Sequence, residues 1–338
     1  MGLFSLTQEL AIDLGTGNAL ILYNGKVVVD EPSIIAMDIH TGKVVAIGEQ
    51  AQQMHGKTHQ NIRTIRPLKD GVIADFNAAE LMLRGMIKKV KMSGHLFSPS
   101  LRMVICIPSG STNVEIRTVR ESAEHAGGRE VYMIYEPMAA ALGAGLNVEA
   151  PEGHMVIDIG GGSLEVAMGS DEDPTVALSV PAGAGRVTRE FLPESGVADD
   201  DDLEAARKNI RKILEPMVKS FPKSKHPMHA VGTSKTIRSL ARLAGAVMRQ
   251  PGRVDTSIMT IDQLEDWLPR LAAIAPDQRT ALPGVTPERT YQIVGGGLVI
   301  DEIMKALDVK EIEICPWALR EGAILRWLDQ FGRTRLGF

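Results

Sequence analysis

Three features are scarce in this sequence. Only two of its 338 residues are cysteines, Cys106 and Cys315, and they lie far apart in apolar surroundings. We expect both to be buried structural thiols, a usage that suits a reducing cytoplasm. Apolar runs stay short of the roughly 18 residues that a membrane-spanning helix requires. The first eleven residues carry Glu9 where a signal peptide needs an apolar core, so we expect no signal peptide.

Basic residues are not in excess either. The chain has 37 Lys and Arg against 42 Asp and Glu, a net charge of -5, which argues against nucleic acid as a partner. Hydrophobic residues make up 44% and charged residues 23%, as in ordinary soluble globular proteins. The length predicts about two domains of roughly 150 residues each.

A strand, aspartate and glycine-turn pattern occurs twice. Residues 10–37 predict a strand meander with a hairpin at Asn24-Gly25. Residues 103–107, 113–126, 131–134 and 136–146 predict a strand, a helix, a strand and an Ala-rich helix. A second meander covers 155–167 and turns at 160–162. The two units lie about 145 residues apart and predict two similar α/β domains, residues 1–152 and 153–338.

The remainder of the sequence is predicted to be more helical. The acidic run 199–202 is suited to the N-terminus of a helix over 203–221, where the helix dipole favours negative charge. We further expect helices up to 244 and over 261–274, 287–306 and 317–330, a strand at 312–314, and loops at 245–259 and 275–288.

Four turns rich in Gly, Ser or Thr are candidate phosphate sites, because such turns expose successive backbone N–H groups. Two of them follow a strand that ends in an aspartate, Asp13 or Asp158, and two carboxylates beside phosphate suit hydrated Mg²⁺. Each turn alone is also consistent with an ordinary turn, and 232–236 equally with a helix start capped by Ser or Thr. The candidate residues are Gly15, Thr16, Gly17, Asn18, Gly160, Gly161, Gly162, Ser163, Gly232, Thr233, Ser234, Gly295, Gly296 and Gly297.

Glu136 has two interpretations. At the start of a predicted helix it can be an acid stabilised by the helix dipole. It can also be a base that orients an attacking water, since phosphoryl transfer needs mainly positioning and charge neutralisation.

The segments Asp13–Asn18 and Asp158–Gly162 resemble the phosphate turns of the actin, sugar-kinase and heat-shock-chaperone superfamily. This resemblance implies the actin-like ATPase (ribonuclease H-like) fold, an α/β fold of two similar domains around a nucleotide or phosphate cleft. It also implies that Asp13 and Asp158 serve a bound Mg²⁺ and that Gly295–Gly297 form the adenosine turn.

More specific resemblances divide the chain. Residues 1–168 resemble the MreB family of bacterial actins, which implies ATP binding, filament formation and a role in cell shape. The matching segments are Asp30–Ser33, Gly42–Gly48, Ile65–Asp75, Ile107–Gly110 and Tyr135–Ala141. Residues 158–333 resemble the exopolyphosphatase/guanosine pentaphosphatase (Ppx/GppA) family. The matching segments are Asp158–Glu165, Gly183–Leu192, Ala230–Leu243 and Pro316–Gly322. The chain is therefore interpreted as a chimera of two actin-like domains that meet at the second turn.

The resemblance to the MreB family assigns Glu136 the water-orienting role and gives Leu96-Phe97 a place in a membrane-binding loop beside the basic residues Lys88, Lys89 and Lys91. The alternative is a buried loop anchor. We expect a cytoplasmic protein that can lie at the inner face of the membrane and can self-associate into filaments or dimers.

Three functional hypotheses remain open at this point. The first is a Mg²⁺-dependent, ATP-binding cytoskeletal ATPase. The second is an exopolyphosphatase or guanosine pentaphosphate hydrolase, for which Arg186, Arg189, Lys235 and Arg238 offer contacts to a polyanion, unless they form a solvated helix face. The third is a folded hybrid without activity.

Overall fold

The computed structural model describes residues 7–23, 26–57, 60–69, 72–90, 100–109, 111–143, 154–169, 174–222, 229–248 and 257–315. These residues form two compact units, one up to Ala139 and the other from Ala140 onward. The predicted domain boundary near 152 lies in a stretch outside the described residues. No helix in the described ranges has both the length and the apolar character to cross a membrane.

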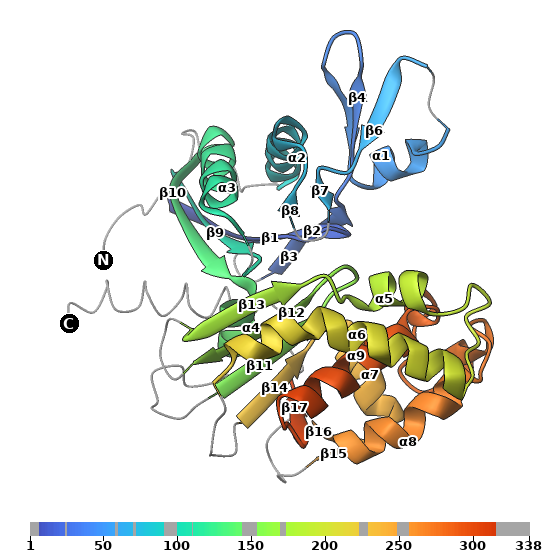
Figure 1. The fold of residues 1–338 in the computed structure, drawn as a ribbon. Helices are drawn as coiled ribbons and strands as arrows, with labels where there is room; N and C mark the ends of the chain where they lie inside the picture. The colour runs from blue at the N-terminus through green and yellow to red at the C-terminus, as the bar shows by residue number, and fades with distance from the viewer. Residues whose placement is uncertain are drawn as a thin grey trace, which may run out of the picture. The chain divides into compact units, whose positions relative to one another are not determined.

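The first unit is built on a five-stranded mixed sheet in the order β10-β9-β1-β2-β3. Strand β1 pairs in parallel with β9 and antiparallel with β2, and β9 pairs in parallel with β10. Helices α2 and α3 lie side by side on one face of this sheet (Figure 1). The elements are β1 (Thr7–Leu14), β2 (Asn18–Tyr23), β3 (Lys26–Pro32), α2 (Phe76–Lys89), β9 (Ser100–Ile107), α3 (Asn113–His125) and β10 (Gly128–Tyr135), and α4 (Glu136–Gly143) spans the boundary between the units.

A smaller antiparallel sheet in the order β5-β4-β6 and a two-stranded ribbon complete this unit. Their elements are β4 (Ile35–Asp38), β5 (Val44–Ile47), α1 (Glu49–Met54), β6 (Ile62–Ile65), β7 (Leu68–Lys69) and β8 (Val72–Ile73).

The second unit has a seven-stranded sheet in the order β13-β12-β11-β14-β17-β16-β15. Its strands are β11 (His154–Ile159), β12 (Leu164–Gly169), β13 (Val176–Val180), β14 (His229–Thr233), β15 (Val247–Met248), β16 (Ser257–Thr260) and β17 (Glu311–Ile314). Its helices are α5 (Ala184–Phe191), α6 (Asp200–Ser220), α7 (Lys235–Leu243), α8 (Ile261–Ala272) and α9 (Ile293–Ala306), with 3₁₀ turns at Gln278–Ala281 and Pro287–Arg289.

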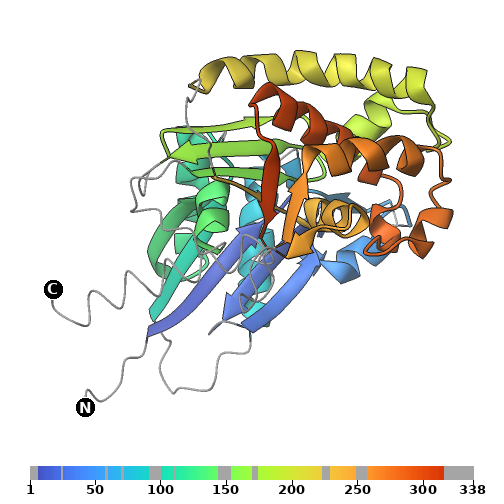
Figure 2. The same cartoon turned by 90° about the horizontal axis from the view of Figure 1, so that it is seen from below.

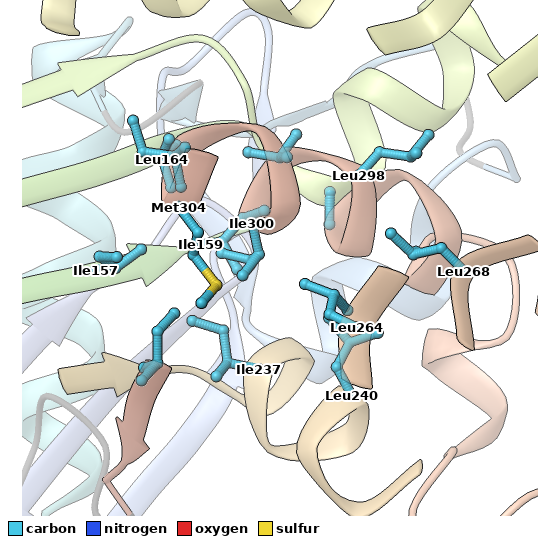
Figure 3. Packing of buried hydrophobic residues seen from close by; sticks show 14 of the residues in the cluster. Ile157, Ile159, Leu164, Ile237, Leu240, Leu264, Leu268, Leu298, Ile300 and Met304 are labelled. Atoms are coloured by element: carbon cyan, nitrogen blue, oxygen red, sulfur yellow. The ribbon is translucent and has the colours of Figure 1, made fainter. Parts of the chain in front are cut away.

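Helix α9 is the centre of the second unit, because α5, α6, α7 and α8 all pack against it. In Figure 2, α6 runs along the outer side of α9. The apolar residues of α6 recur every three or four positions and face inward, as in an amphipathic helix. Figure 3 shows Leu298, Ile300 and Met304 of α9 among apolar side chains from the sheet and from α7 and α8.

Several predicted elements are confirmed. The acidic run caps α6 as expected: the Asp199 side chain accepts from the Asp202 N–H, and the Asp202 side chain accepts from the Asp199 N–H. Both cysteines are buried free thiols. The repeat is also real, since the β1–β2 and β11–β12 hairpins each have an aspartate as the second-last residue of the first strand.

Other predictions are wrong or lie outside the described residues. The predicted loop 245–259 contains β15 and most of β16, which pair with each other at the sheet edge, whereas 275–288 is a loop with a 3₁₀ turn, as predicted. The Asn24-Gly25 turn, the Leu96-Phe97 loop and the C-terminal helix over 317–330 lie outside the described residues.

Candidate functional site

Asp13 lies at the carboxyl end of β1, in the middle of its sheet. It is paired with Leu20 of β2 on one side and with Cys106 of β9 on the other. The neighbouring strand β10 runs parallel to β9, with Ile134 opposite Cys106. The carboxyl ends of three parallel strands therefore meet at one edge, the usual place for ligands in such sheets.

The turn after Asp13 is held by the segment that follows β3. The Ser33 hydroxyl donates to the Gly15 carbonyl at 2.6 Å, and the Ser33 N–H donates to the Gly17 carbonyl at 2.9 Å. A Cβ on Gly15 would lie 2.7 Å from the Asn18 carbonyl oxygen, so this position requires glycine. The Asn18 side-chain amide donates to Asp30 at 2.9 Å. These contacts within the protein hold the conformation of residues 15–18.

Glu136 lies at the same edge of the first sheet as Asp13. It directly follows β10 and opens α4. Burial raises the pKa of the Cys106 thiol, and the negative charges of Asp13 and Glu136 raise it further. Both carboxylates are therefore close enough to act on one buried thiol. The position in the first turn of α4 is also the one that the helix dipole favours, so both interpretations of Glu136 remain.

Asp158 occupies the matching position in the second unit. It is paired with Thr233 of β14 and Glu165 of β12. Burial raises the pKa of the Asp158 carboxyl above its ordinary value, and the Thr233 hydroxyl opposes that shift. Thr233 is buried, and its hydroxyl oxygen forms no hydrogen bond of normal geometry with the described residues. The Asp158 carboxyl and the Thr233 hydroxyl thus lie next to each other in a place where burying polar groups costs free energy.

The turn after Asp158 is braced by the start of α5. The Gly160 N–H donates to the Ser163 carbonyl at 2.9 Å, which closes the turn. From α5, the Ala184 N–H donates to Gly160 at 2.9 Å and the Arg186 N–H donates to Gly161 at 3.0 Å. These bonds occupy carbonyls of the turn. Within the described part of the chain, no acceptor is found for the N–H groups of Gly161 and Gly162, which are the donors an anion would use.

Sequence reasoning did not identify this brace. Its signal was the small-residue run Gly183-Ala184-Gly185, which lets α5 approach the turn closely. A Cβ on Gly183 would lie 2.4 Å from backbone atoms of Gly162 and Ser163.

Replacing Gly183 by alanine is expected to destabilise the protein by about 1–3 kcal/mol, because backbone atoms of the turn cannot give way as a flexible side chain can. The matched control is Gly161→Ala, where an added Cβ meets nothing within 4 Å. Urea denaturation of both variants measures the difference. Equal stabilities would contradict the close packing of α5 on the turn.

The third predicted turn, 232–236, is a strand end followed by a helix start. Gly232 and Thr233 belong to β14, so for them the turn prediction is wrong. Ser234 is the N-cap of α7, with its hydroxyl accepting from the Ile237 N–H at 3.2 Å, which confirms the alternative of a Ser/Thr cap. The φ of Ser234 is 108°, an uncommon angle for a residue with a side chain.

The prediction of a fourth turn at Gly295–Gly297 is wrong, whereas the predicted helix over 287–306 is confirmed from Ile293 onward, because these glycines lie inside α9 and are buried. An added Cβ would lie 2.3 Å from Thr188 Oγ1 at Gly295, 2.6 Å from Thr236 Cγ2 at Gly296 and 2.5 Å from Leu268 Cδ2 at Gly297. Glycine is needed here because α5, α7 and α8 pack closely on α9. Three glycines in a row suggest a turn locally, but the buried surroundings favour a helix.

The residues present are compatible with a hydrated Mg²⁺. Among the described residues, no three or more His, Cys, Asp or Glu side chains are arranged to hold a metal ion. Mg²⁺ that takes one or two carboxylates together with water and phosphate oxygens does not need such a cluster. Asp158 beside the buried Thr233 hydroxyl offers polar oxygens of this kind.

Two family profiles match this chain. The profile of the MreB/Mbl protein family matches residues 7–192, and that of the Ppx/GppA phosphatase family matches residues 126–331. The matches overlap over a segment that contains Asp158 and its turn, where the two resemblances were expected to meet.

Curated relatives agree with the first match. The cell shape-determining protein Mbl of Bacillus subtilis (strain 168) is 35% identical over 295 residues, covering 87% of this chain and 84% of that protein. The cell shape-determining protein MreB of Escherichia coli (strain K12) is 49% identical over 190 residues, covering 55% of this chain and 54% of MreB. The more identical alignment thus spans about half of each protein.

Solved structures confirm the predicted actin-like fold. MreB5 of Spiroplasma citri bound to ADP aligns with a TM-score of 0.57 and 23% identity, covering 98% of this chain and 99% of MreB5. The type II variant of the Aquifex aeolicus Ppx/GppA phosphatase aligns with a TM-score of 0.59 and 18% identity, covering 95% of this chain and 99% of that one.

Proposed function

Because the chain belongs to the MreB/Mbl family over residues 7–192 and to the Ppx/GppA family over residues 126–331, we propose that it is a Mg²⁺-dependent protein that binds and hydrolyses ATP and takes part in determining bacterial cell shape. Relatives named cell shape-determining proteins, 35–49% identical to this chain, support the cytoskeletal part of the proposal.

The braced turn at 160–163 carries the proposal. The carbonyls of Gly160 and Gly161 accept from α5, and the N–H groups of Gly161 and Gly162 are left for phosphate oxygens. In the proposal, Asp158 and the Thr233 hydroxyl are the residues that would hold a hydrated Mg²⁺. Magnesium, when bound, neutralises negative charge on the phosphate oxygens. Little further chemistry is needed, since phosphoryl transfer depends mainly on positioning and electrostatic stabilisation.

The first unit carries a phosphate turn of its own and, in the proposal, a residue that orients water. The turn held by Ser33 presents Gly15, Thr16 and Gly17 beside Asp13. Glu136 at the same sheet edge orients the attacking water, a role that requires an ionised carboxylate.

Self-association and location complete the proposal. The filament "MamK double helical filament" aligns with this chain with a TM-score of 0.53 and 16% identity, which shows the shared fold. We place the protein in the cytoplasm, where it forms filaments or dimers. Contact with the inner face of the membrane through Leu96-Phe97 rests on the composition of that loop and its basic neighbours.

A second candidate function is exopolyphosphatase activity, because cations gather at the start of α7. Arg289 donates to the Thr236 hydroxyl at 3.2 Å. Burial lowers the pKa of Arg289; the charge of Glu288 opposes this shift, and the charge of Arg238 adds to it. Adjacent cations of this kind favour a polyanion.

Phosphate release from ATP, GTP and polyphosphate, measured in parallel with Mg²⁺, distinguishes these functions. We expect ATP to be hydrolysed and ATP to promote pelleting of the protein. Release from polyphosphate alone would support the second candidate. Release from none of the three, together with no thermal shift by Mg-ATP, would identify a folded hybrid without activity.

A further inference from the structure

The buried glycines of α9 face different neighbours. At Gly295 an added Cβ would lie 2.3 Å from Thr188 Oγ1 and 2.9 Å from the Ala184 carbonyl oxygen, both on α5. At Gly297 it would meet Leu268 of α8 at 2.5 Å and Leu240 of α7 at 3.3 Å. Glycine is therefore needed at two positions of one helix for different reasons: Gly295 makes room for α5, and Gly297 makes room for α7 and α8.

The part of α5 that touches Gly295 is the part that braces the 160–163 turn. Ala184 donates through its N–H to Gly160, while its carbonyl accepts from the Thr188 hydroxyl at 2.8 Å. Arg186, in the same helical turn, donates to Gly161. The first turn of α5 thus lies between Gly295 and the phosphate turn. Both the N–H and the carbonyl of Ala184 are already hydrogen-bonded.

Helix α9 is held more firmly than α5. Every residue of α9 from Ile293 to Met304 is buried, and Figure 3 shows its apolar side chains surrounded by those of the sheet and of α7 and α8. Arg207 of α6 also pairs with both Asp301 and Glu302 of α9. Helix α5 has only eight residues. Atoms added between the two helices will therefore move α5.

We propose that Gly295 is a positioning residue for the 160–163 turn. By lacking a side chain it lets α5 sit close to α9, and this position of α5 sets the direction of the Gly161 and Gly162 N–H groups. The position of the turn depends on no ligand, and only the consequence for hydrolysis rests on the proposed function. This role differs from contact with an adenosine, which the sequence resemblance implied for Gly295.

Amide NMR spectra of the full chain without nucleotide test the proposal. Gly295→Ala is expected to shift the amide signals of Gly160, Gly161 and Gly162 and to make the Ala184 and Arg186 amides exchange about fivefold faster, the effect of weakening one hydrogen bond. The matched control, Gly297→Ala, adds the same methyl group toward α7 and α8 and is expected to leave these five amides unchanged. Equal effects of the two variants would overturn the proposal.

A double variant covers the case in which Gly295→Ala does not fold. Thr188→Ala removes the atom closest to the added Cβ but leaves the Ala184 carbonyl oxygen and the Thr188 nitrogen at 2.9 Å, so in Gly295→Ala/Thr188→Ala the Gly160 and Gly161 signals are expected to return only part of the way to their wild-type positions. Displacements of these signals no larger than those in Gly297→Ala would contradict the path through α5.

Kinetics separate positioning from direct contact with nucleotide. For a displaced turn, kcat for ATP should fall by about 10- to 100-fold, because small misplacements of catalytic groups are costly, while KM changes little. A raised KM with unchanged turn amides would instead support direct contact and overturn the proposal. If the wild-type chain hydrolyses nothing, the proposed function fails, and the NMR result still decides the role of Gly295.

Discussion

Replacing Asp158 by asparagine is expected to lower the rate of phosphate release by about 100-fold or more, the usual effect of removing one electrostatic contact to the reacting group. Asparagine keeps the shape of the side chain, but it carries no charge to hold a hydrated cation. Phosphate release under saturating Mg-ATP measures the loss.

The same substitution should not weaken the fold. Burial raises the pKa of Asp158 above its ordinary value of 3.8, so the folded protein holds this proton more tightly than the unfolded chain. The contribution of Asp158 to stability therefore falls as pH rises through the window between 3.8 and the raised value. Above that window, Asp158→Asn should be at least as stable as wild type. If Asp158→Asn instead melts at a much lower temperature than wild type, its loss of phosphate release is explained by unfolding.

The control for Asp158→Asn is Asp201→Asn. Asp201 is exposed in the first turn of α6 and outside the proposed site. We expect it to retain wild-type phosphate release. Undiminished turnover in Asp158→Asn itself would remove this residue from the mechanism.

Replacing Arg207 by methionine is expected to destabilise the second unit by about 3–5 kcal/mol, the cost of leaving buried charge without its partner. Arg207 pairs with Asp301 and, at 2.8 Å, with Glu302. Asp301 and Glu302 are both buried, with 0% and 3% of their surface exposed. Arg211 pairs with Glu302 at 2.7 Å, and Lys305 pairs with Asp301 at 3.0 Å. Neither of them bridges the two carboxylates as Arg207 does. Thermal denaturation should show a loss of about 10 °C.

The matched control is Arg270→Met on α8. Its ion pair with Asp266 is mostly exposed, so its removal should cost less than about 0.5 kcal/mol. If both substitutions cost the same, the buried network does not stabilise α9.

The pH dependence gives a second check on Arg207. Burial tends to raise the pKa of Glu302, but Arg211 and Arg207 together hold it below its ordinary value of 4.5. A lowered carboxyl pKa stabilises the fold above the ordinary value, and that contribution is lost as pH falls through the lowered value. The stability gap between wild type and Arg207→Met should therefore narrow below pH 4.5.

Elements that depend on local pattern were predicted well. The apolar runs before Asp13 and Asp158 form strands, because continuous β-branched and aliphatic residues suit a buried, partly parallel sheet. The acidic run caps α6 because its side-chain oxygens accept hydrogen bonds from the unpaired N–H groups of the first helical turn. This interaction is local and depends little on the rest of the fold.

The errors have a common cause. Gly295–Gly297 suggest a turn from their own conformational freedom, but burial against Thr188, Thr236 and Leu268 makes a helix the better state. The short strands β15 and β16 lie in a predicted loop because their stability comes from pairing with each other and with β17, over a distance that local sequence does not encode.

By itself, the sequence determined the repeated strand, aspartate and glycine-turn units, the two families and the residue types able to bind phosphate, because these depend on residue identity and short spacing. Only the tertiary structure decided that Glu136 reaches the sheet edge of Asp13, that Thr233 lies beside Asp158 and that α5 braces the second turn. The strand pairings at these sites join residues up to 93 positions apart, as from Asp13 to Cys106 in neighbouring strands of one sheet, and the contacts are fixed by strand register and helix packing. Register and packing are properties of the folded chain that a local pattern does not contain.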